Sequence, residues 1–218
     1  MRQQKIHPQW PRIIDKQKQE NTIGFFGDSF CANSTSEHSW CIKLANRLDC
    51  GKITHWGVGG TSVFYMLLNF QKLVAKKTLP KHIVILYTEP DRIYHPDVLL
   101  PVWASDEKSV TELEIASDLY RKHLDFKDLN QFQYQSSVQW FDQNILSKLQ
   151  NEHKIIQIFS FEKPNFELHS GKIFSQALYP NYFENMRQGI PDKNLFNHMT
   201  PDQNENLAES LSIIFKTL

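Results

Sequence analysis

Short apolar runs alternate with helical stripes along most of this chain. Four runs bounded by turn-forming residues or a change of pattern are typical of buried strands: 23–26, 53–56, 83–87 and 155–159. Between them, apolar residues recur every three or four positions, the period of a helix that packs on one face. The pattern predicts four helices, which begin at Ser39, Ser62, Ser137 and Thr200.

The last of these helices has the clearest start signals. Thr200 is a capping residue, Pro201 takes the first helical position and Gln203 completes a capping box. We therefore expect the chain to turn sharply into a helix at this point.

Strands that alternate with helices predict an α/β fold. Such strands pair in parallel through right-handed crossovers, which gives a doubly wound sheet covered by helices on both faces. Ligands bind beyond the carboxyl ends of these strands. The segments after Phe26, Trp56 and Tyr87 should therefore lie side by side along one edge of the sheet.

The length of 218 residues favours one domain that spans 1–218. Residues 1–20 are predicted to be a polar N-terminal arm. Residues 89–135 mix prolines, charges and aromatic residues, with one helical stretch at 113–124, and are predicted to be a long insertion after the third strand. Insertions of this kind are usually lids or binding loops. Residues 161–199 are expected to be irregular.

Composition narrows the classes of partner. Lysine plus arginine equals aspartate plus glutamate at 24 each, so no overall field attracts nucleic acid or an anionic membrane. The chain has no signal-peptide pattern and no apolar run of about 18 residues. We expect a soluble, cytoplasmic protein without a membrane or nucleic-acid partner. The three cysteines lack a paired metal-ligand spacing and are expected to be reduced thiols.

Ser29 is a candidate nucleophile. The triplet Gly27-Asp28-Ser29 follows the first buried strand, and a serine on a tight strand-to-helix turn can expose its hydroxyl at the reactive edge. A serine hydroxyl reacts only with a base in reach and with donors aimed at the developing oxyanion. The alternative is that this serine only caps a helix.

A glycine-rich turn follows the second strand. Gly60 lacks a side chain, so its N–H can turn toward a ligand beside Ser29. The alternative is a phosphate loop, but a dinucleotide fingerprint would need glycine where the chain has Ser62, and no P-loop lysine follows. We expect no cofactor.

His198 is a candidate general base. It lies immediately before the last helix, which would return its imidazole to the edge where Ser29 lies. A neutral imidazole near pH 7 is the base that a serine nucleophile requires.

Three blocks together resemble the SGNH/GDSL hydrolase family. Gly27-Asp28-Ser29 is similar to its nucleophile block, the stretch at 55–62 to its second block, and His198 with the helix that contains Asn204 to its last block. The resemblance implies a flavodoxin-like three-layer sandwich that hydrolyses esters or O-acetyl groups on a small-molecule or carbohydrate substrate. It also implies that the N–H groups of Ser29 and Gly60 bind the oxyanion.

The third block departs from the family pattern. An asparagine usually donates to the oxyanion there, whereas this chain has Thr88, Glu89 and Pro90, with Arg92 close behind. Proline has no N–H to donate. Thr88 could offer a hydroxyl and Arg92 a charged donor, so Thr88, Glu89 and Arg92 are candidate substrate-binding residues. Glu89 and Arg92 could instead form a structural ion pair.

The acid that orients the histidine is displaced. Position 195 holds a leucine, and Asp192 reaches His198 only if the intervening chain loops outward. A backbone carbonyl or Asn197 could hold the ring instead. The sequence therefore predicts an irregular triad or a Ser-His dyad.

Two other classes of function stay open. One is a catalytically weak or inactive protein that binds a glycan or small ligand in the same cleft. The other is a metal site formed by Asp91, His95 and Asp97, although solvated loop charges explain these residues better. We expect no metal.

Overall fold

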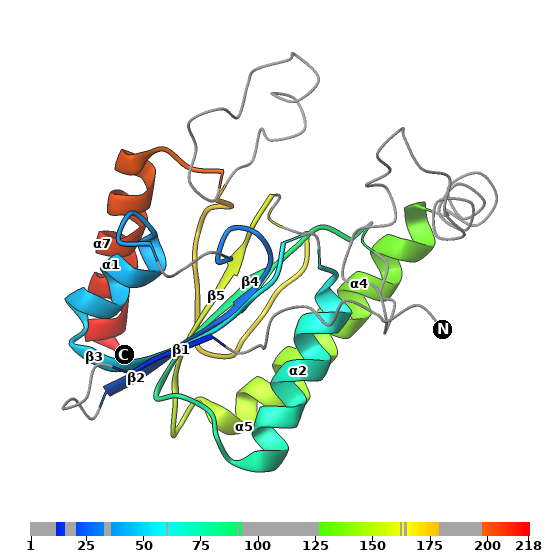
Figure 1. Cartoon of the computed structure of the whole chain (residues 1–218). Helices are drawn as coiled ribbons and strands as arrows, with labels where there is room; N and C mark the ends of the chain where they lie inside the picture. Colours follow the sequence, from blue (N-terminus) through cyan, green and yellow to red (C-terminus); the bar gives the residue numbers. More distant parts are fainter. Residues whose placement is uncertain are drawn as a thin grey trace, which may run out of the picture.

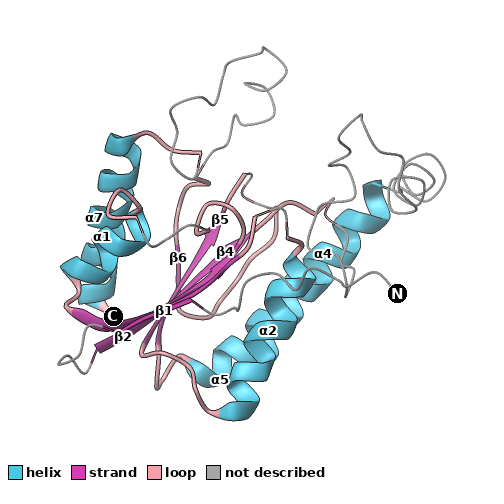
Figure 2. Ribbon diagram, in the orientation of Figure 1, coloured by secondary structure: helices cyan, strands magenta, loops and turns pink. Residues whose placement is uncertain are grey.

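The computed structural model describes residues 12–15, 21–32, 36–59, 61–90, 92, 127–161, 163, 165–178 and 198–218. In this part of the chain, a sheet of strand order β1-β3-β2-β4-β5-β6 lies between two layers of helices (Figures 1 and 2). Its strands are β1 (Arg12–Asp15), β2 (Asn21–Gly27), β3 (Cys50–Gly57), β4 (His82–Tyr87), β5 (Lys154–Phe159) and β6 (Lys172–Ile173).

The helices divide between the two faces of the sheet. On one face lie α1 (Trp40–Arg47) and α7 (Pro201–Thr217). On the other lie α2 (Val63–Lys76) and α4 (Lys127–Phe141), and α4 continues through a π-helical turn, η1 (Asp142–Leu146), into α5 (Ser147–Leu149). The predicted α/β three-layer architecture is confirmed, and the five strands from β3 to β6 in the sheet order pair in parallel.

Two apolar cores hold the layers together. Neighbouring residues of a strand point to opposite faces, so Phe25 packs in the core beneath α1 and α7, and Phe26 packs in the core beneath α2 and α4. All six residues of β4 are buried, as its continuous apolar run predicts. The carboxyl ends of β3, β2 and β4 lie side by side, as predicted.

Strand β1 corrects the expected N-terminal arm. Residues 12–15 pair antiparallel with β3 at the edge of the sheet, so the segment 1–20 is not wholly an arm. Ile13 and Ile14 are the only apolar residues of β1, and two adjacent positions are too few to show the alternating pattern of a strand. β6 similarly lies in the stretch 161–199 that was expected to be irregular.

Helix α4 corrects the predicted end of the insertion. It begins at Lys127 rather than Ser137, so residues 127–135 belong to the helix. Its buried stripe includes the polar Asn130, while Leu129 and Phe132 are 47% and 67% exposed. The apolar pattern therefore does not follow the buried face. The predicted helix at 113–124 lies outside the described residues.

None of the helices in the described part of the chain is both long enough and apolar enough to cross a membrane.

Candidate active site

Ser29 lies in a tight turn at the carboxyl end of β2. The carboxylate of Asp28 accepts a hydrogen bond from the N–H of Phe30 at 3.0 Å, and the N–H of Cys31 donates to the Asp28 carbonyl at 3.2 Å. The Asp28 side chain is fully buried, whereas Ser29 is partly exposed. The turn therefore holds the serine at the reactive edge of the sheet.

His198 brings an imidazole to this turn from the other end of the chain. Its Nε2 atom lies 2.9 Å from Oγ of Ser29, and its ring centroid lies 5.1 Å from that of Phe30. Its φ angle is 62°, in the left-handed region that residues other than glycine rarely adopt. The chain bends there just before the capping box of Thr200 and Gln203, which is present as predicted.

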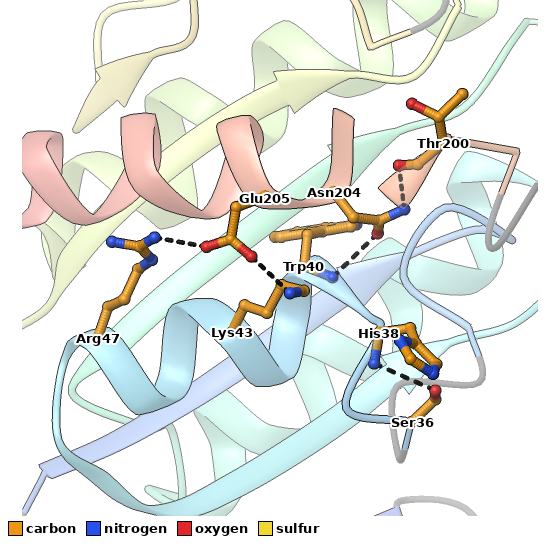
Figure 3. A network of polar contacts seen from close by, with 8 residues as sticks. All are labelled: Ser36, His38, Trp40, Lys43, Arg47, Thr200, Asn204 and Glu205. Carbon is orange, nitrogen blue, oxygen red and sulfur yellow. Dashed lines mark hydrogen bonds and ion pairs between the residues drawn. The ribbon is translucent and has the colours of Figure 1, made fainter. Parts of the chain in front are cut away.

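A polar network joins the turn of Ser29 to the helix that follows His198. Figure 3 shows the part of it that links Trp40, Asn204 and Thr200. The side-chain oxygen of Asn204 accepts the N–H of Trp40 at 3.0 Å, and its Nδ2 donates to the carbonyls of Met199 at 3.2 Å and Thr200 at 3.1 Å. The indole Nε1 of Trp40 donates to the carbonyl of Phe30 at 2.8 Å. Trp40 and Asn204 are both fully buried, so they fix the two loops with respect to each other.

Farther along the same two helices, Glu205 forms ion pairs with Lys43 and Arg47, each at 2.5 Å. These contacts add to the packing of α1 on α7 at the surface.

The glycine turn after β3 lies against the nucleophile turn. A Cβ atom at Gly57 would come within 2.5 Å of backbone atoms of Cys31, whereas one at Gly59 would meet, among the described residues, only the Cβ of Ser29, at 3.8 Å. The N–H of Val58 donates to the carbonyl of Gly27 at 3.1 Å. The turn therefore lies beside Ser29, as predicted, while Gly60 itself lies outside the described residues.

The loop after β4 contains a buried ion pair. Nε of Arg92 donates to Oε1 of Glu89 at 2.6 Å, and both side chains are more than nine-tenths buried. The predicted structural ion pair is confirmed. Thr88 is 4% exposed, and its hydroxyl has no hydrogen-bond partner among the described residues.

The remaining predicted groups lie outside the described residues. These are Asp192 and Asn197, the candidates for orienting His198, and the Asp91, His95 and Asp97 of the alternative metal site. Within the described ranges, no group of three or more histidine, cysteine or acidic side chains could hold a metal ion.

Cys31 is a poor candidate nucleophile, although it lies close to Ser29 in the sequence. Burial raises the pKa of its thiol well above the ordinary value, and nearby Cys41 and Asp28 raise it further. A thiol that stays protonated is a poor nucleophile. The three cysteines are free, as predicted, and all three are buried.

Trp40 and Asn204 were not predicted to position the site. Trp40 belongs to an apolar helical stripe, which indicates packing, and Asn204 belongs to the last resembled block. Their hydrogen bond spans 164 positions, and a single sequence has no signal for such a contact.

Comparisons with known proteins identify structural likenesses. No model of a protein family matches the sequence, and no curated protein matches it. A protein described as lipolytic, of the G-D-S-L family, from Desulfitobacterium hafniense is 11% identical, with a TM-score of 0.43 over 89% of this chain and 99% of its own. An acetyl xylan esterase is 13% identical, with a TM-score of 0.41 over 87% of this chain and 97% of its own.

A third similar structure is an alpha/beta hydrolase enzyme from the metagenome of Lake Arreo in Spain. It is 10% identical, with a TM-score of 0.45 over 90% of this chain and 95% of its own. These identities and TM-scores are low, and they give no information on the chemistry of the site.

Proposed function

We propose that this protein is a serine-dependent ester hydrolase. The observation that supports the proposal most directly is the distance of 2.9 Å between Nε2 of His198 and Oγ of Ser29. This distance lies within the range of a hydrogen bond between a nucleophile and its general base. The partial exposure of Ser29 supports access of a substrate to this pair.

In the proposed reaction, Ser29 Oγ attacks the ester carbonyl while His198 Nε2 takes the hydroxyl proton. The tetrahedral oxyanion accepts hydrogen bonds from the N–H groups of Ser29 and Gly60. His198 then returns the proton to the leaving alcohol as the carbon–oxygen bond breaks, which leaves an acyl group on Ser29. Water repeats these steps and releases the carboxylic acid. Asp192 as the group that orients His198 stays a prediction.

Thr88 is proposed as the replacement for the missing asparagine donor. Its buried hydroxyl has no partner among the described residues. Because an unsatisfied buried polar group costs free energy, its presence calls for an explanation, and a catalytic role is one. Glu89 and Arg92, in contrast, bind each other. We propose that the Thr88 hydroxyl donates to the oxyanion and that Glu89 and Arg92 hold the loop.

The proposed substrate class is a small or carbohydrate-linked ester such as an acetate. This class follows from the resemblance of the nucleophile, glycine and histidine blocks. Assays with a panel of esters would identify the acyl group and the alcohol of the preferred substrate.

Covalent labelling with a fluorophosphonate tests the proposal. We expect one adduct on Ser29, no adduct in Ser29→Ala, and loss of both labelling and ester hydrolysis in His198→Ala. Ser212→Ala is a matched control, since Ser212 is a buried serine on α7 that donates to the carbonyl of Glu209. A folded wild-type protein that forms no adduct and hydrolyses no ester would contradict the proposal and favour a protein that only binds a ligand.

A further inference from the structure

Arg92 is a buried cation that contacts three loops at the carboxyl edge of the sheet. Its side chain is 4% exposed, and its Nε donates to Glu89 in the loop after β4. Its Nη1 donates to the carbonyl of Thr61, after β3, at 3.4 Å. Its Cζ atom lies 5.3 Å from the ring centroid of Phe161, after β5. One side chain therefore links the loops on both sides of the nucleophile turn.

The contact with Thr61 reaches the glycine turn. The N–H of Thr61 donates to the carbonyl of Val58 at 3.3 Å, and the N–H of Val58 donates to the carbonyl of Gly27 at 3.1 Å. The turn is thus held to β2 at its beginning and to Arg92 at its end. Gly60, the proposed oxyanion donor, lies between these two points in the sequence.

The contact with Phe161 reaches the nucleophile and the base. The ring of Phe161 packs on that of Phe30 at 5.4 Å between centroids, and Phe30 packs on His198 at 5.1 Å. Phe30 directly follows Ser29. Because offset and edge-on aromatic contacts have preferred geometries, a displacement of Phe161 would disturb the surroundings of both reacting side chains.

Stability alone is a weak reason for this ion pair. The loss of solvation offsets much of the attraction between two buried charges, and replacement of both charges by neutral groups is often neutral or stabilising. Removal of one partner is costly because it leaves the other charge buried and unpaired. A role in geometry can therefore be separated from a role in folding if both charges are removed together.

We propose that Arg92 is a positioning residue that holds the glycine turn and Phe161 against the turn of Ser29. This inference rests on the ester hydrolysis proposed above. Without Arg92, the end of the turn at Thr61 and the ring of Phe161 would shift with respect to Ser29 and His198. A misplacement of about 1 Å can lower a rate on the order of 10²-fold.

The test compares three variants with the wild-type protein. Arg92→Met with Glu89→Gln removes both charges, and Arg92→Lys keeps a charge for Glu89 but lacks the planar second donor. Lys154→Met is the control, because Lys154 also donates to a backbone carbonyl, that of Phe215, from the amino end of β5. We expect kcat to fall about tenfold or more in the double variant, with KM within about twofold, and to recover only in part in Arg92→Lys.

Three results would overturn the inference. The first is a wild-type kcat in the folded double variant. The second, if the double variant does not fold, is a wild-type kcat in Arg92→Lys. The third is a loss of kcat in Lys154→Met as large as that in the Arg92 variants.

Failure of the proposed function has a different signature, namely no labelling of wild-type Ser29. Hydrogen exchange then tests the positioning by itself. We expect faster exchange of the amides at 57–62 and at 161 in whichever Arg92 variant folds, with unchanged exchange in α1. Unchanged exchange at 57–62 and 161 would overturn the inference.

Discussion

The side chain of Asn204 accepts the backbone N–H of Trp40 at 3.0 Å, across 164 positions of the sequence. The same side chain donates to the carbonyl of Met199, the residue after His198. The hydrogen bond therefore connects the start of α1, which follows the turn of Ser29, with the start of α7, which follows His198 (Figure 3). We therefore expect the short distance between Ser29 and His198 to depend on this junction of the two helices.

Asn204→Ala should lower both stability and activity. The change leaves the buried N–H of Trp40 without its acceptor, which costs about 1–3 kcal/mol of the free energy of unfolding. It also frees the carbonyl of Met199, so His198 is held less firmly and kcat falls. Thermal unfolding and ester hydrolysis measure the two effects.

The neighbouring Glu205→Gln is the control for this prediction. It weakens only the exposed ion pairs with Lys43 and Arg47, and such pairs contribute little. An equal loss of kcat in both variants would mean that α7 does not position His198 through Asn204.

The elements that were predicted correctly have a strong signal within their own segment. The strand at 83–87 is buried on both faces and continuously apolar, and the helix at 201 begins with a capping box. For α4 only the predicted start was wrong, because Leu129 and Phe132 face solvent while Asn130 is buried. Packing against other segments decides which of these residues are buried, and the local pattern of apolar residues carries no information on that packing.

For the candidate site, the types of residue came directly from the sequence. The expectation that they lie close together came from the predicted arrangement of strands and helices. Ser29 was predicted to lie at this edge of the sheet because it follows a strand, and His198 because it immediately precedes the last helix. The roles of Trp40, Asn204 and Phe161 could not be predicted, since each depends on a contact between distant segments. The burial of Thr88 likewise depends on the surrounding loops.

Gly57→Ala should displace the nucleophile turn. The added Cβ would lie 2.5 Å from the backbone of Cys31, and a backbone contact cannot be relieved by rotation of a side chain. We expect a loss of about 1–3 kcal/mol or more from overpacking, together with slower labelling of Ser29. Denaturant unfolding and fluorophosphonate labelling rates measure these changes.

Gly59→Ala is the matched glycine variant for stability. Within the part of the chain that the structure describes, its Cβ would meet only the Cβ of Ser29, at an ordinary contact distance of 3.8 Å. The free energy of unfolding should therefore stay close to that of the wild-type protein. A similar loss in both variants would show that the close approach of Gly57 to Cys31 is not the cause.

His82 should make the protein less stable at mildly acidic pH. Burial lowers the pKa of its imidazole, and nearby Lys154 and Lys81 lower it further, against a hydrogen bond with the Thr22 carbonyl. The unfolded chain therefore takes up the proton at a higher pH than the folded chain does. The free energy of unfolding should fall as the pH drops below about 6.5.

Melting temperatures between pH 7.5 and pH 5 test this prediction. The slope should become shallower in His82→Gln and should be unchanged in His38→Gln, which removes an exposed imidazole. Equal slopes in the wild-type protein and His82→Gln would assign the acid sensitivity to other groups.

Thr88→Val should separate stability from activity. Valine has nearly the shape of threonine, and it removes a buried hydroxyl that has no partner among the described residues. The free energy of unfolding should therefore be unchanged or higher. If the hydroxyl donates to the oxyanion, kcat should fall on the order of 10²-fold, the usual cost of one such donor, with little change in KM.

Thr88→Ser keeps the hydroxyl and removes only a methyl group, so it should retain most of the wild-type kcat while losing some stability. Valine should therefore lower kcat without lowering stability, whereas serine should lower stability with little effect on kcat. If Thr88 has only a structural role, the kcat of Thr88→Val should equal that of the wild-type protein. That result would leave the N–H groups of Ser29 and Gly60 as the proposed donors, and the oxyanion would then be bound without a third donor from the loop after β4.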